Sequence, residues 1–320
     1  MIITKTPLRI ALAGGGTDLP LFTRKYTGKV ISMAINQYIY TYIFKRNETA
    51  STIVQTSNLQ EVKINEKIKH KLIRETLKFF KVKEKIHIGF FSTMPTRSGV
   101  GSSSSLVVGI INSILKFKKI TMSKKQISEI AITIERKILN EKGGIQDQIS
   151  AAYGGINLIN CYKNFKFKLK KFNINENGIK FLEKNLILVF SNTKRFSTDI
   201  IKSQKKDSII SYLEVKKEVQ TITEVIRKKS TKKLGFIFNN HWIRKKKISS
   251  VMTNSKIDKL YNKLNKNSQF LGGKLIGAGG GGFFLFVIKN KKKAINFLIK
   301  NKLEYSEIKI DNIGVRSIKY

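Results

Sequence analysis

The sequence predicts an α+β protein that folds in two lobes, and three observations lead to this prediction. Runs of alternating apolar and polar residues, which are typical of strands, are mixed along the chain with runs of helical spacing. The 320 residues exceed the size at which a single hydrophobic core is usual. The composition changes at residues 173–178, so we expect an N-terminal domain over 1–172 and a C-terminal domain over 173–320.

The N-terminal domain is expected to begin with strands. Period-two alternation predicts strands at residues 2–6, 8–13, 29–36, 38–45 and 85–91. Pro7 separates the first two strands, and the third and fourth form a hairpin. Helical spacing predicts helices at residues 68–80, 106–117 and 123–139. Ser123 is the expected N-cap of the last helix, because its hydroxyl can accept from a free amide of the first turn.

The C-terminal domain is expected to mix both kinds of element. It has predicted strands at residues 185–190, 283–288 and 305–311, and predicted helices at 209–227, 234–246, 255–269 and 291–300. Just before the domain boundary, residues 162–172 interleave Lys with Phe. This pattern suits a platform for single-stranded nucleic acid, but a strand with one buried face and lysines in water predicts it equally. We favour the strand.

The composition is strongly basic. The formal net charge is +41, and the 62 basic residues comprise 52 Lys and 10 Arg. Proteins that bind the phosphates and bases of nucleic acids favour Arg, whose planar guanidinium group donates two hydrogen bonds at once, and their basic residues cluster in one surface patch. Here the lysines are spread along the whole chain. We therefore interpret them as a solvated surface and expect neither nucleic acid nor a membrane as a partner.

Several chemistries and locations are excluded by what the sequence contains. The single cysteine, Cys161, rules out an internal disulfide and fits a reducing compartment. His70, His87 and His241 lack the spacing of a zinc site. The N-terminus has no signal-peptide pattern, and no apolar run approaches the length of a membrane span. We therefore expect a cytoplasmic protein.

A glycine- and serine-rich loop at residues 95–105 lies between a predicted strand and a predicted helix. A helix that starts after small residues offers free backbone N–H groups, the positive end of its dipole and several hydroxyls to one point. This is a site for phosphate, and we interpret the loop as a cradle for ATP. The alternative is an ordinary loop followed by a helix that a serine caps.

A second loop, at residues 14–20, follows the first strands. Gly14, Gly15 and Gly16 allow a tight turn and the close approach of a ligand. Thr17 and Asp18 place a hydroxyl and a carboxylate directly after the glycines. This combination suits a polyhydroxylated substrate, and the alternative is a plain glycine turn.

A third glycine-rich stretch covers residues 277–282. Gly277, Gly279 and Gly282 satisfy the dinucleotide pattern G-x-G-x-x-G, but a predicted strand follows them where that fold requires a helix. A Rossmann fold is therefore rejected. The phosphate-binding motif G-x-x-x-x-G-K-[ST] and the protein-kinase signatures H-R-D and D-F-G are absent from the sequence.

Acidic residues in the region 135–155 are candidates for chemistry. Asp147 lies between two glutamines after a glycine pair, where it can sit at a helix N-terminus that favours a carboxylate. The alternative role for Asp147 is a helix cap. Glu135 lies beside an apolar helix face, where an acid either stays solvated or binds a metal.

Together the three glycine-rich stretches resemble the three motifs of the GHMP kinases, the superfamily of galactokinase and of homoserine, mevalonate and phosphomevalonate kinases. Residues 7–18, 95–104 and 277–282 match the motifs in order, spacing and total length. The resemblance covers essentially the whole chain. It implies a two-lobed fold with an N-terminal lobe like domain 2 of ribosomal protein S5 and a ferredoxin-like α/β lobe at the C-terminus.

The resemblance also implies roles for single residues. ATP would be held by Gly99, Val100, Gly101, Ser102, Ser103, Ser104, Gly279 and Gly280. Mg²⁺ would be bound by Ser103 and Glu135, with Glu141 a weaker candidate. Asp147 matches the acid that accepts a proton from the attacking hydroxyl or orients it, and Arg9 matches the basic partner that keeps this acid ionised. Phosphoryl transfer of this kind depends on positioning and charge neutralisation.

The first motif narrows the choice of acceptor, the molecule that would receive the phosphoryl group. Galactokinases usually carry Gly-Glu-His-Thr-Asp, whereas residues 14–18 read Gly-Gly-Gly-Thr-Asp. This chain is most similar to the bacterial D-glycero-D-manno-heptose 7-phosphate kinases, which phosphorylate the anomeric hydroxyl to give a 1,7-bisphosphate for nucleotide-activated heptose and surface polysaccharide. Substrate contacts would come from Gly16, Thr17, Asp18 and Arg195.

Three other functions remain open at this point. A fucokinase-like sugar 1-kinase shares parts of the motifs. A more distant alternative is a nucleic-acid-binding protein, and a third is a family member without catalytic activity. The motifs do not predict an oligomeric state.

Overall fold

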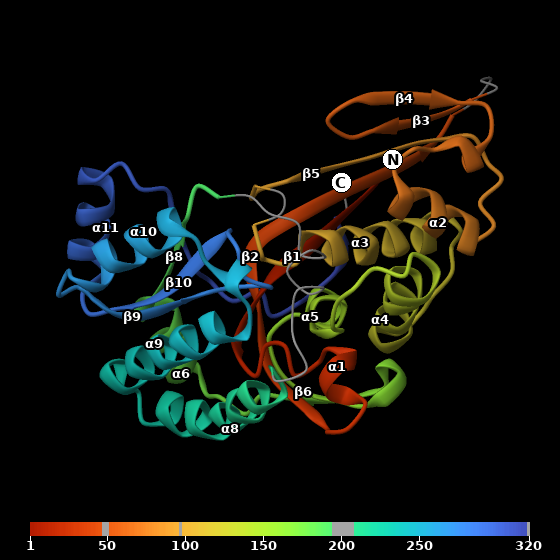
Figure 1. Cartoon of the computed structure of the whole chain (residues 1–320). Coiled ribbons are helices and arrows are strands. Elements are labelled where there is room, and N and C mark those ends of the chain that lie inside the picture. The colour runs from red at the N-terminus through yellow and green to blue at the C-terminus, as the bar shows by residue number, and fades with distance from the viewer. Residues whose placement is uncertain (47–50, 96–97, 194–207, 319–320) are drawn as a thin grey trace.

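The computed structural model describes residues 1–46, 51–95, 98–193 and 208–318 (Figure 1). These residues form two β-sheets, one of eight strands and one of four, each covered by helices. The eight-stranded sheet is built mainly from the first half of the chain, and the four-stranded sheet belongs to the second half. The predicted α+β class is therefore what the structure shows.

Two long antiparallel strands form the centre of the first sheet. β1 (Ile2–Ala13) pairs along its length with β2 (Gly28–Lys45). The predicted break at Pro7 and the predicted hairpin within β2 are both wrong. A register shift replaces them, because Pro7 lies opposite Tyr38 and Leu8 lies opposite Ile35. The shift is a bulge, which bends paired strands without ending them.

The other strands extend this sheet on both sides. Its main path runs β12-β1-β2-β5-β3-β4, and the first half of β2 also pairs with β6, which pairs with β7. These strands are β3 (Thr52–Gln55), β4 (Leu59–Val62), β5 (Ile86–Ser92), β6 (Ile156–Cys161), β7 (Phe167–Lys171) and β12 (Arg316–Ile318). β1 pairs with β2 throughout, but along its other edge β2 pairs first with β6 and then with β5, so the sheet divides along that edge.

Helices of the first half pack against this sheet. The helix α3 lies along both β1 and β2, with most of its side chains buried. The helical segments here are α1 (Pro20–Thr23), a 3-10 turn at Asn65–Lys67, α2 (Lys71–Phe79), α3 (Ser102–Phe117), α4 (Lys124–Ile132), a π-helical segment at Thr133–Ile138, and α5 (Gln146–Tyr153). Ser123 caps α4 as predicted, in a capping box with Gln126.

The second sheet has the strand order β11-β8-β10-β9. Its strands are β8 (Leu186–Phe190), β9 (Phe270–Leu275), β10 (Phe283–Ile288) and β11 (Tyr305–Glu307). β10 is buried at every position, which explains its continuous apolar sequence. The helices of this lobe are α6 (Glu176–Asn185), α8 (Ser208–Arg227), α9 (Thr231–Ile248), α10 (Ser255–Asn265) and α11 (Lys291–Lys300), with a 3-10 turn at Ser250–Met252.

Two glycines bring α9 very close to β9. A Cβ atom on Gly235 of α9 would lie 2.3 Å from the carbonyl oxygen of Leu271, and one on Gly272 would lie 2.2 Å from the oxygen of Gly235. Only residues without a side chain allow this contact. It fixes the position of α9, which carries His241 and Lys245, against β9.

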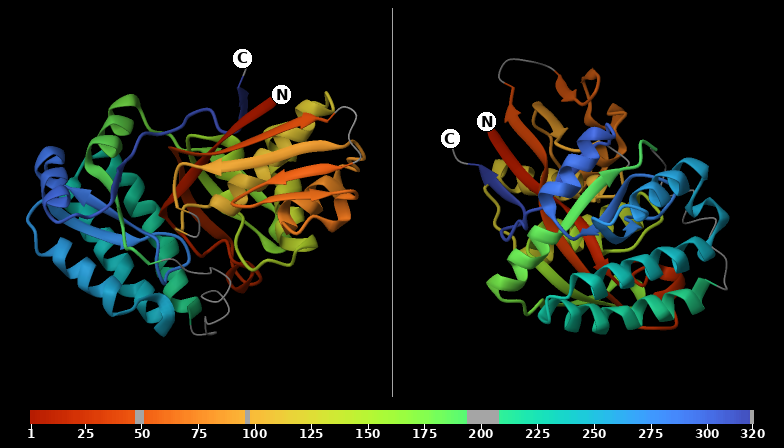
Figure 2. Two further views of the ribbon diagram at one scale, coloured as in Figure 1. Left: turned by 90° about the horizontal axis from the view of Figure 1, so that it is seen from above. Right: turned by 90° about the vertical axis from the view of Figure 1, so that its left-hand side faces the viewer.

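The chain crosses back between the lobes near its C-terminal end. Ile310 forms a bridge with Ile35, and β12 pairs with β1 on the first sheet. The two ends of the chain consequently lie close together, as both views in Figure 2 show. Residues after the second sheet thus contact the N-terminal lobe, and the division at residue 172 stays a prediction.

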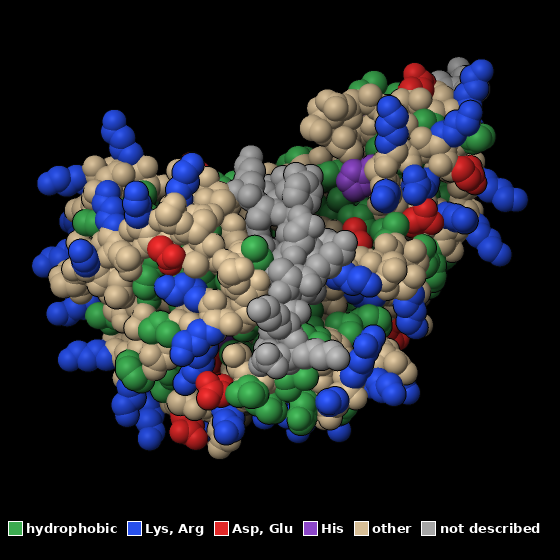
Figure 3. Space-filling view, viewed as in Figure 1, with side chains coloured by type: hydrophobic (Ala, Val, Ile, Leu, Met, Phe, Trp, Pro, Cys, Tyr) green, Lys and Arg blue, Asp and Glu red, His purple; other side chains and the backbone are tan. Residues whose placement is uncertain are grey.

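The Lys/Phe segment forms a strand with one covered face, in part as predicted. A 3-10 turn occupies Lys163–Phe165, and β7 follows. The side chains of Phe165, Phe167 and Leu169 pack against a buried apolar cluster, whereas the lysines between them are exposed. The rings are therefore not available as a stacking platform. On the face drawn in Figure 3, Lys and Arg side chains are spread over both lobes.

Cys161 is buried in β6, where burial first and the charge of Asp18 second raise the pKa of its thiol well above the ordinary value. None of the described helices is both long and apolar enough to cross a lipid bilayer.

Candidate active site

A cavity of about 510 Å³ lies where the two lobes meet. Both lobes contribute to its walls, and so do all three glycine-rich stretches. From the N-terminal lobe it is lined by Arg9, Gly15, Gly16, Asp18, His70, Phe90, Gly99, Gly101, Ser102, Ser103, Ser104, Glu135, Glu141 and Asp147, and from the C-terminal lobe by Tyr212, His241, Lys245, Lys274, Gly277 and Ala278, among others. A pocket of this size accommodates a substrate with a cofactor fragment.

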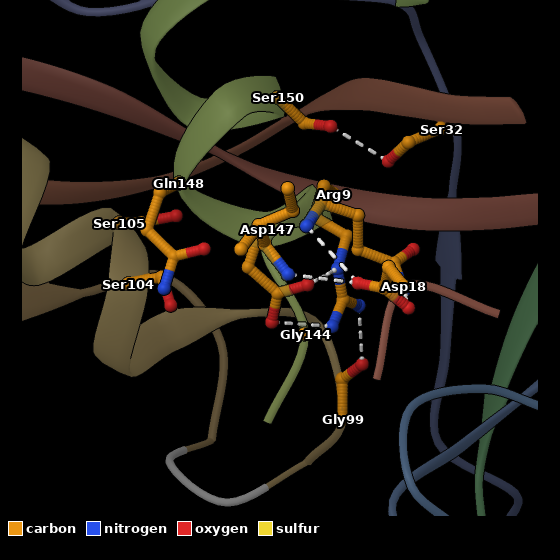
Figure 4. A network of polar contacts seen from close by, with 12 residues as sticks. Arg9, Asp18, Ser32, Gly99, Ser104, Ser105, Gly144, Asp147, Gln148 and Ser150 are labelled. Carbon is orange, nitrogen blue, oxygen red and sulfur yellow. Dashed lines mark hydrogen bonds and ion pairs between the residues drawn. The ribbon is translucent and has the colours of Figure 1, made fainter. Parts of the chain in front are cut away.

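Arg9 and Asp147 form a bidentate ion pair inside this cavity. Nε of Arg9 lies 2.6 Å from Oδ1 of Asp147, and Nη2 lies 2.6 Å from Oδ2. The remaining nitrogen, Nη1, donates to the carbonyl oxygen of Gly99 at 2.7 Å (Figure 4). Arg9 is 6% exposed, whereas the Asp147 side chain is 21% exposed. The carboxylate is thus oriented by a fixed guanidinium while it remains open to the cavity.

The glycine- and serine-rich loop at residues 95–105 is positioned by the same arginine. The backbone N–H of Arg9 donates to the carbonyl oxygen of Val100 at 3.0 Å. Gly101 has a φ of +80° and caps the start of α3, so its left-handed backbone turns the chain directly into the helix. Oγ of Ser102 is buried and has no hydrogen-bond partner among the described residues. A phosphate held at this helix N-terminus would supply the missing partner.

Ser103, Ser104 and Glu135 come together on the other side of the loop. Glu135 is 1% exposed and accepts from Oγ of Ser103 at 3.1 Å and from Oγ of Ser104 at 2.7 Å. The amide of Gln148 also donates to this carboxylate. Glu135 lies in the π-helical segment, which displaces it from a regular helix face.

This group of oxygens fits Mg²⁺. A carboxylate and a hydroxyl that both line the cavity are ligands that Mg²⁺ prefers, and Mg²⁺ usually takes one or two carboxylates together with substrate phosphates. Among the described residues there is no group of three or more His, Cys, Asp or Glu side chains that could hold a metal alone. Glu141 also lines the cavity, and burial together with the charge of Glu135 raises its pKa.

Asp18 anchors the start of α5. Its Oδ2 accepts from the backbone N–H groups of Ile145 and Gln146 at 2.9 and 3.1 Å, and its Oδ1 accepts from Nε2 of Gln146 at 3.1 Å. Burial first and the nearby charge of Asp147 second raise the pKa of Asp18, while these amides oppose the shift. Asp18 therefore holds the turn of α5 that carries Asp147.

Thr17 does not reach the cavity. It is fully buried, its hydroxyl lies 2.8 Å from the carbonyl oxygen of Gly14 and 3.0 Å from that of Lys29, and it accepts from the backbone N–H of Lys29 at 3.0 Å. In the structure the Thr17 hydroxyl therefore holds the loop, and its expected contact with the substrate stays a prediction. Gly16 does line the cavity, against the ring of Tyr212.

The third glycine-rich stretch, residues 277–282, mainly packs against neighbouring segments of the chain. Gly280 donates its N–H to Met252 at 2.8 Å, and a Cβ on Gly279 would lie 2.3 Å from the Met252 sulfur. Neither glycine lines the cavity, whereas Gly277 and Ala278 do, so the expected contact of Gly279 and Gly280 with ATP stays a prediction.

The same stretch also packs against the loop at residues 95–105, which is the expected phosphate loop. The N–H of Phe283 donates to the carbonyl oxygen of Ser98 at 3.1 Å, and a Cβ on Gly282 would lie 2.1 Å from that oxygen. Arg195, a predicted substrate residue, lies outside the described residues.

Among the described residues, four cavity residues of the C-terminal lobe with polar or ionisable side chains were not predicted as site residues from the sequence. They are Tyr212, His241, Lys245 and Lys274. Only Lys274 carried a local signal, since it precedes the third glycine stretch by three residues. The others lie on helices whose apolar spacing gives no indication of function.

His241 and Lys274 are buried ionisable groups. Nδ1 of His241 is 2.7 Å from Oε2 of Glu218, but burial lowers the pKa of His241 to about 4, and the charge of Lys274 contributes to this shift. Burial also lowers the pKa of Lys274 to about 8, against the charge of Glu218. Nζ of Lys274 donates to the carbonyl oxygen of Leu12 at 2.7 Å.

Comparisons with known proteins agree with this geometry. Residues 66–155 match the family profile described as the GHMP kinases N terminal domain. The D-glycero-alpha-D-manno-heptose 7-phosphate kinase of Campylobacter jejuni subsp. jejuni serotype O:2 is 30% identical over an alignment of 337 positions, which covers 99% of this chain and 98% of the relative. The chain belongs to the GHMP kinase family.

Further relatives of this GHMP kinase differ in function. The bifunctional fucokinase/GDP-fucose pyrophosphorylase of Arabidopsis thaliana is 24% identical over 90% of this chain and 30% of the relative. A solved D-glycero-D-manno-heptose 1-phosphate kinase from Bacteriodes thetaiotaomicron has a TM-score of 0.83 at 22% identity, covering 100% of this chain and 99% of that one. A mevalonate kinase structure has a TM-score of 0.75 at 22% identity, covering 98% and 100%. The predicted two-lobed GHMP kinase fold is confirmed.

Proposed function

We propose that this GHMP kinase transfers the γ-phosphoryl group of ATP to the anomeric C1 hydroxyl of D-glycero-D-manno-heptose 7-phosphate. The observation that carries the proposal is the Arg9–Asp147 pair, which lies in one cavity with the serine-rich N-terminus of α3. The whole-length similarity to a heptose 7-phosphate kinase supports the choice of acceptor. The product would be the 1,7-bisphosphate used for nucleotide-activated heptose and surface polysaccharide, made in the cytoplasm.

ATP would be held by the N-terminus of α3. The free N–H groups of its first turn and the unpartnered hydroxyl of Ser102 are suited to phosphate oxygens. Ser103 and Glu135 would hold Mg²⁺, which neutralises charge on the phosphates when bound. Gly277 and Ala278 complete this side of the cavity.

Asp147 would act on the attacking hydroxyl. Both of its oxygens are bound by Arg9, which fixes the carboxylate and leaves its outer lone pairs for the sugar. The carboxylate accepts the proton as the hydroxyl oxygen forms its bond to phosphorus, and the bond from phosphorus to the ADP oxygen breaks. The phosphoryl group passes through a loose transition state, so orientation and positive charge from Arg9 matter more than a strong base.

The experiment is an assay of the purified protein with Mg²⁺ and ATP against free sugars and sugar phosphates, followed by location of the new phosphate by NMR. We expect heptose 7-phosphate to give the highest kcat/KM and the phosphate to appear on C1. Transfer to another hydroxyl, or to none of the sugars, would overturn the proposal. The similarity to a fucokinase makes L-fucose the second candidate, and a preference for it would favour that function.

A further inference from the structure

Three buried side-chain atoms in the described part of the cavity wall have no hydrogen-bond partner. They are Nδ1 of His70, Oγ of Ser102 and Oε1 of Gln146. A buried polar atom without a partner costs free energy, so each of them needs an explanation, and at a cavity wall a bound ligand can supply the partner. Ser102 is assigned above to a phosphate of ATP. Gln146 directly precedes Asp147, on the side of the cavity where the acceptor would bind.

The side-chain amide of Gln146 is held in one orientation. Its Nε2 donates to Oδ1 of Asp18 at 3.1 Å, and its backbone N–H donates to Oδ2 of the same carboxylate at 3.1 Å. The backbone N–H groups of Gly16 and Ile145 also donate to this carboxylate, at 3.3 and 2.9 Å. Because both carboxylate oxygens act as acceptors in these bonds, the amide nitrogen of Gln146 faces Asp18 and the amide oxygen points away from it.

This amide lies beside the catalytic carboxylate. Gln146 and Asp147 are consecutive residues in the first turn of α5. The charge of Asp147 also contributes to the raised pKa of Asp18, the residue that holds the amide, so the two carboxylates are near each other. Gln146 is 8% exposed and lines the cavity. A group that reaches its amide oxygen therefore also lies next to Asp147.

An amide oxygen restricts the kind of group that can bind it. It accepts hydrogen bonds and donates none, so it pairs with a hydroxyl and not with the oxygens of an ionised phosphate. The partner of Gln146 is therefore expected on the sugar and not on the phosphates of ATP. In the proposed reaction Asp147 binds the hydroxyl on C1, and the neighbouring hydroxyl of the sugar ring is the one on C2.

We propose that Oε1 of Gln146 accepts a hydrogen bond from the C2 hydroxyl of the acceptor sugar, beside the C1 hydroxyl that is phosphorylated. This inference rests on the proposed function and names a residue that selects the acceptor. The bond supplies the missing partner of Gln146 and turns the sugar so that its C1 hydroxyl faces Asp147. A sugar without a hydroxyl on C2 leaves the buried oxygen unpaired, so it binds more weakly.

The test is calorimetric titration of the full chain with heptose 7-phosphate, with its 2-deoxy analogue and with Mg²⁺-ATP. The wild type is expected to bind heptose 7-phosphate about tenfold or more tightly than the analogue. Gln146→Met keeps the length of the side chain and removes the amide. It should weaken heptose 7-phosphate about tenfold and the analogue less than about threefold, so that the preference disappears. The affinity for Mg²⁺-ATP should change less than about twofold, because the phosphate loop is intact.

The matched control is Gln148→Met, which changes the other glutamine beside Asp147. Gln148 donates to Glu135 and is not one of the residues that line the cavity, so this variant should keep the wild-type preference for heptose 7-phosphate. Equal weakening of both sugars by Gln146→Met would overturn the inference, because loss of the bond to Asp18 alone predicts that result. Thermal unfolding checks that the variant folds. If it does not, Gln146→Asn replaces it, since the shorter side chain withdraws the oxygen and keeps an amide.

The outcomes separate this inference from the proposed function. Equal affinity of the wild type for both sugars would overturn the inference, even where the phosphate is transferred to C1. Weaker binding of Mg²⁺-ATP by Gln146→Met, with both sugars unaffected, would place the amide on the nucleotide and overturn it as well. A preference for the C2 hydroxyl that depends on Gln146, without transfer to C1, would uphold the inference while contradicting the proposed function.

Discussion

Arg9 and Asp147 are 138 residues apart in the sequence, and both oxygens of Asp147 lie 2.6 Å from nitrogens of Arg9. β1 supplies the arginine and the first turn of α5 supplies the acid, so the pair joins the central strand to the helix beside the phosphate loop. This relationship leads to the first prediction.

Asp147→Asn is expected to lower kcat by about 10²- to 10⁴-fold, the contribution usual for a positioned proton acceptor. The affinity for ATP should change less than about threefold, because the phosphate loop is intact. The measurement is steady-state kinetics together with nucleotide titration. Asp258→Asn is the matched control, since Asp258 forms its ion pair with Lys246 away from the cavity. Near-normal turnover of Asp147→Asn would show that the acid has another role.

Glu135→Gln is expected to raise the Mg²⁺ concentration for half-maximal activity about tenfold or more, because the amide loses the negative charge that would hold the ion. Magnesium titration of activity at fixed ATP measures this effect. The control is Glu129→Gln, an exposed residue on α4 that pairs only weakly with Lys125 at 3.9 Å. If the magnesium requirement is unchanged while stability falls, Glu135 serves only to bind Ser103, Ser104 and Gln148.

Gly144→Ala tests the support of the catalytic acid. A Cβ atom there would lie 1.8 Å from Oδ2 of Asp18, so the carboxylate that anchors α5 must move. We expect a loss of about 1–3 kcal/mol in the free energy of unfolding and a lower kcat. In Gly143→Ala the added atom would meet the Arg136 guanidinium at 2.8 Å, the far end of a flexible side chain. That variant should lose less than about 1 kcal/mol, and equal losses would contradict this account.

Stability should depend on pH through His241. Its pKa is lowered from 6.5 to about 4 in the folded protein, mainly by burial. Between these values the unfolded chain binds more protons, so stability falls as the pH drops from 6.5 towards 4 and does not change further below it through this group. The loss between pH 7 and pH 5 is about 2 kcal/mol.

Urea unfolding of the wild type and of His241→Gln at pH 7 and pH 5 measures this loss. The variant should show a correspondingly smaller change between the two pH values. Burial raises the pKa of Glu218, but its bonds to His241 and Arg244 and the nearby positive charges outweigh burial and lower it, so we expect Glu218 to contribute little to this comparison. Identical pH dependence in both proteins would show that His241 does not titrate as described.

Local patterns predicted the elements that depend on neighbouring residues. The apolar run after the third glycine stretch is the strand β10, Ser123 caps α4, and Asp147 lies in the first turn of α5. The hairpin predicted within residues 29–45 was wrong because polar residues at a bulge resemble those of a turn. The difference lies in the pairing with β1, which is set by residues distant in the sequence.

The site was predictable as a set of motifs but not atom by atom. A motif indicates which residue types are needed, whereas the direction of Thr17 depends on the carbonyl oxygens around it. The roles of Gly279 and Gly280 likewise depend on Met252, which lies in a separate turn. His241 and Lys274 owe their properties to burial at the junction of the lobes, and no local pattern encodes that.

The pairing of β12 with β1 has a consequence for synthesis of the chain. Residues 3–5 of β1 find their outer partner at 316–318, so a loop of about 300 residues must close before that edge is covered. The ribosome synthesises the partner strand, β12, at the end of translation. Until then β1 presents an unpaired edge, the kind of surface through which nascent chains associate with one another. A fragment that ends at residue 172 would keep this edge permanently open and is expected to aggregate.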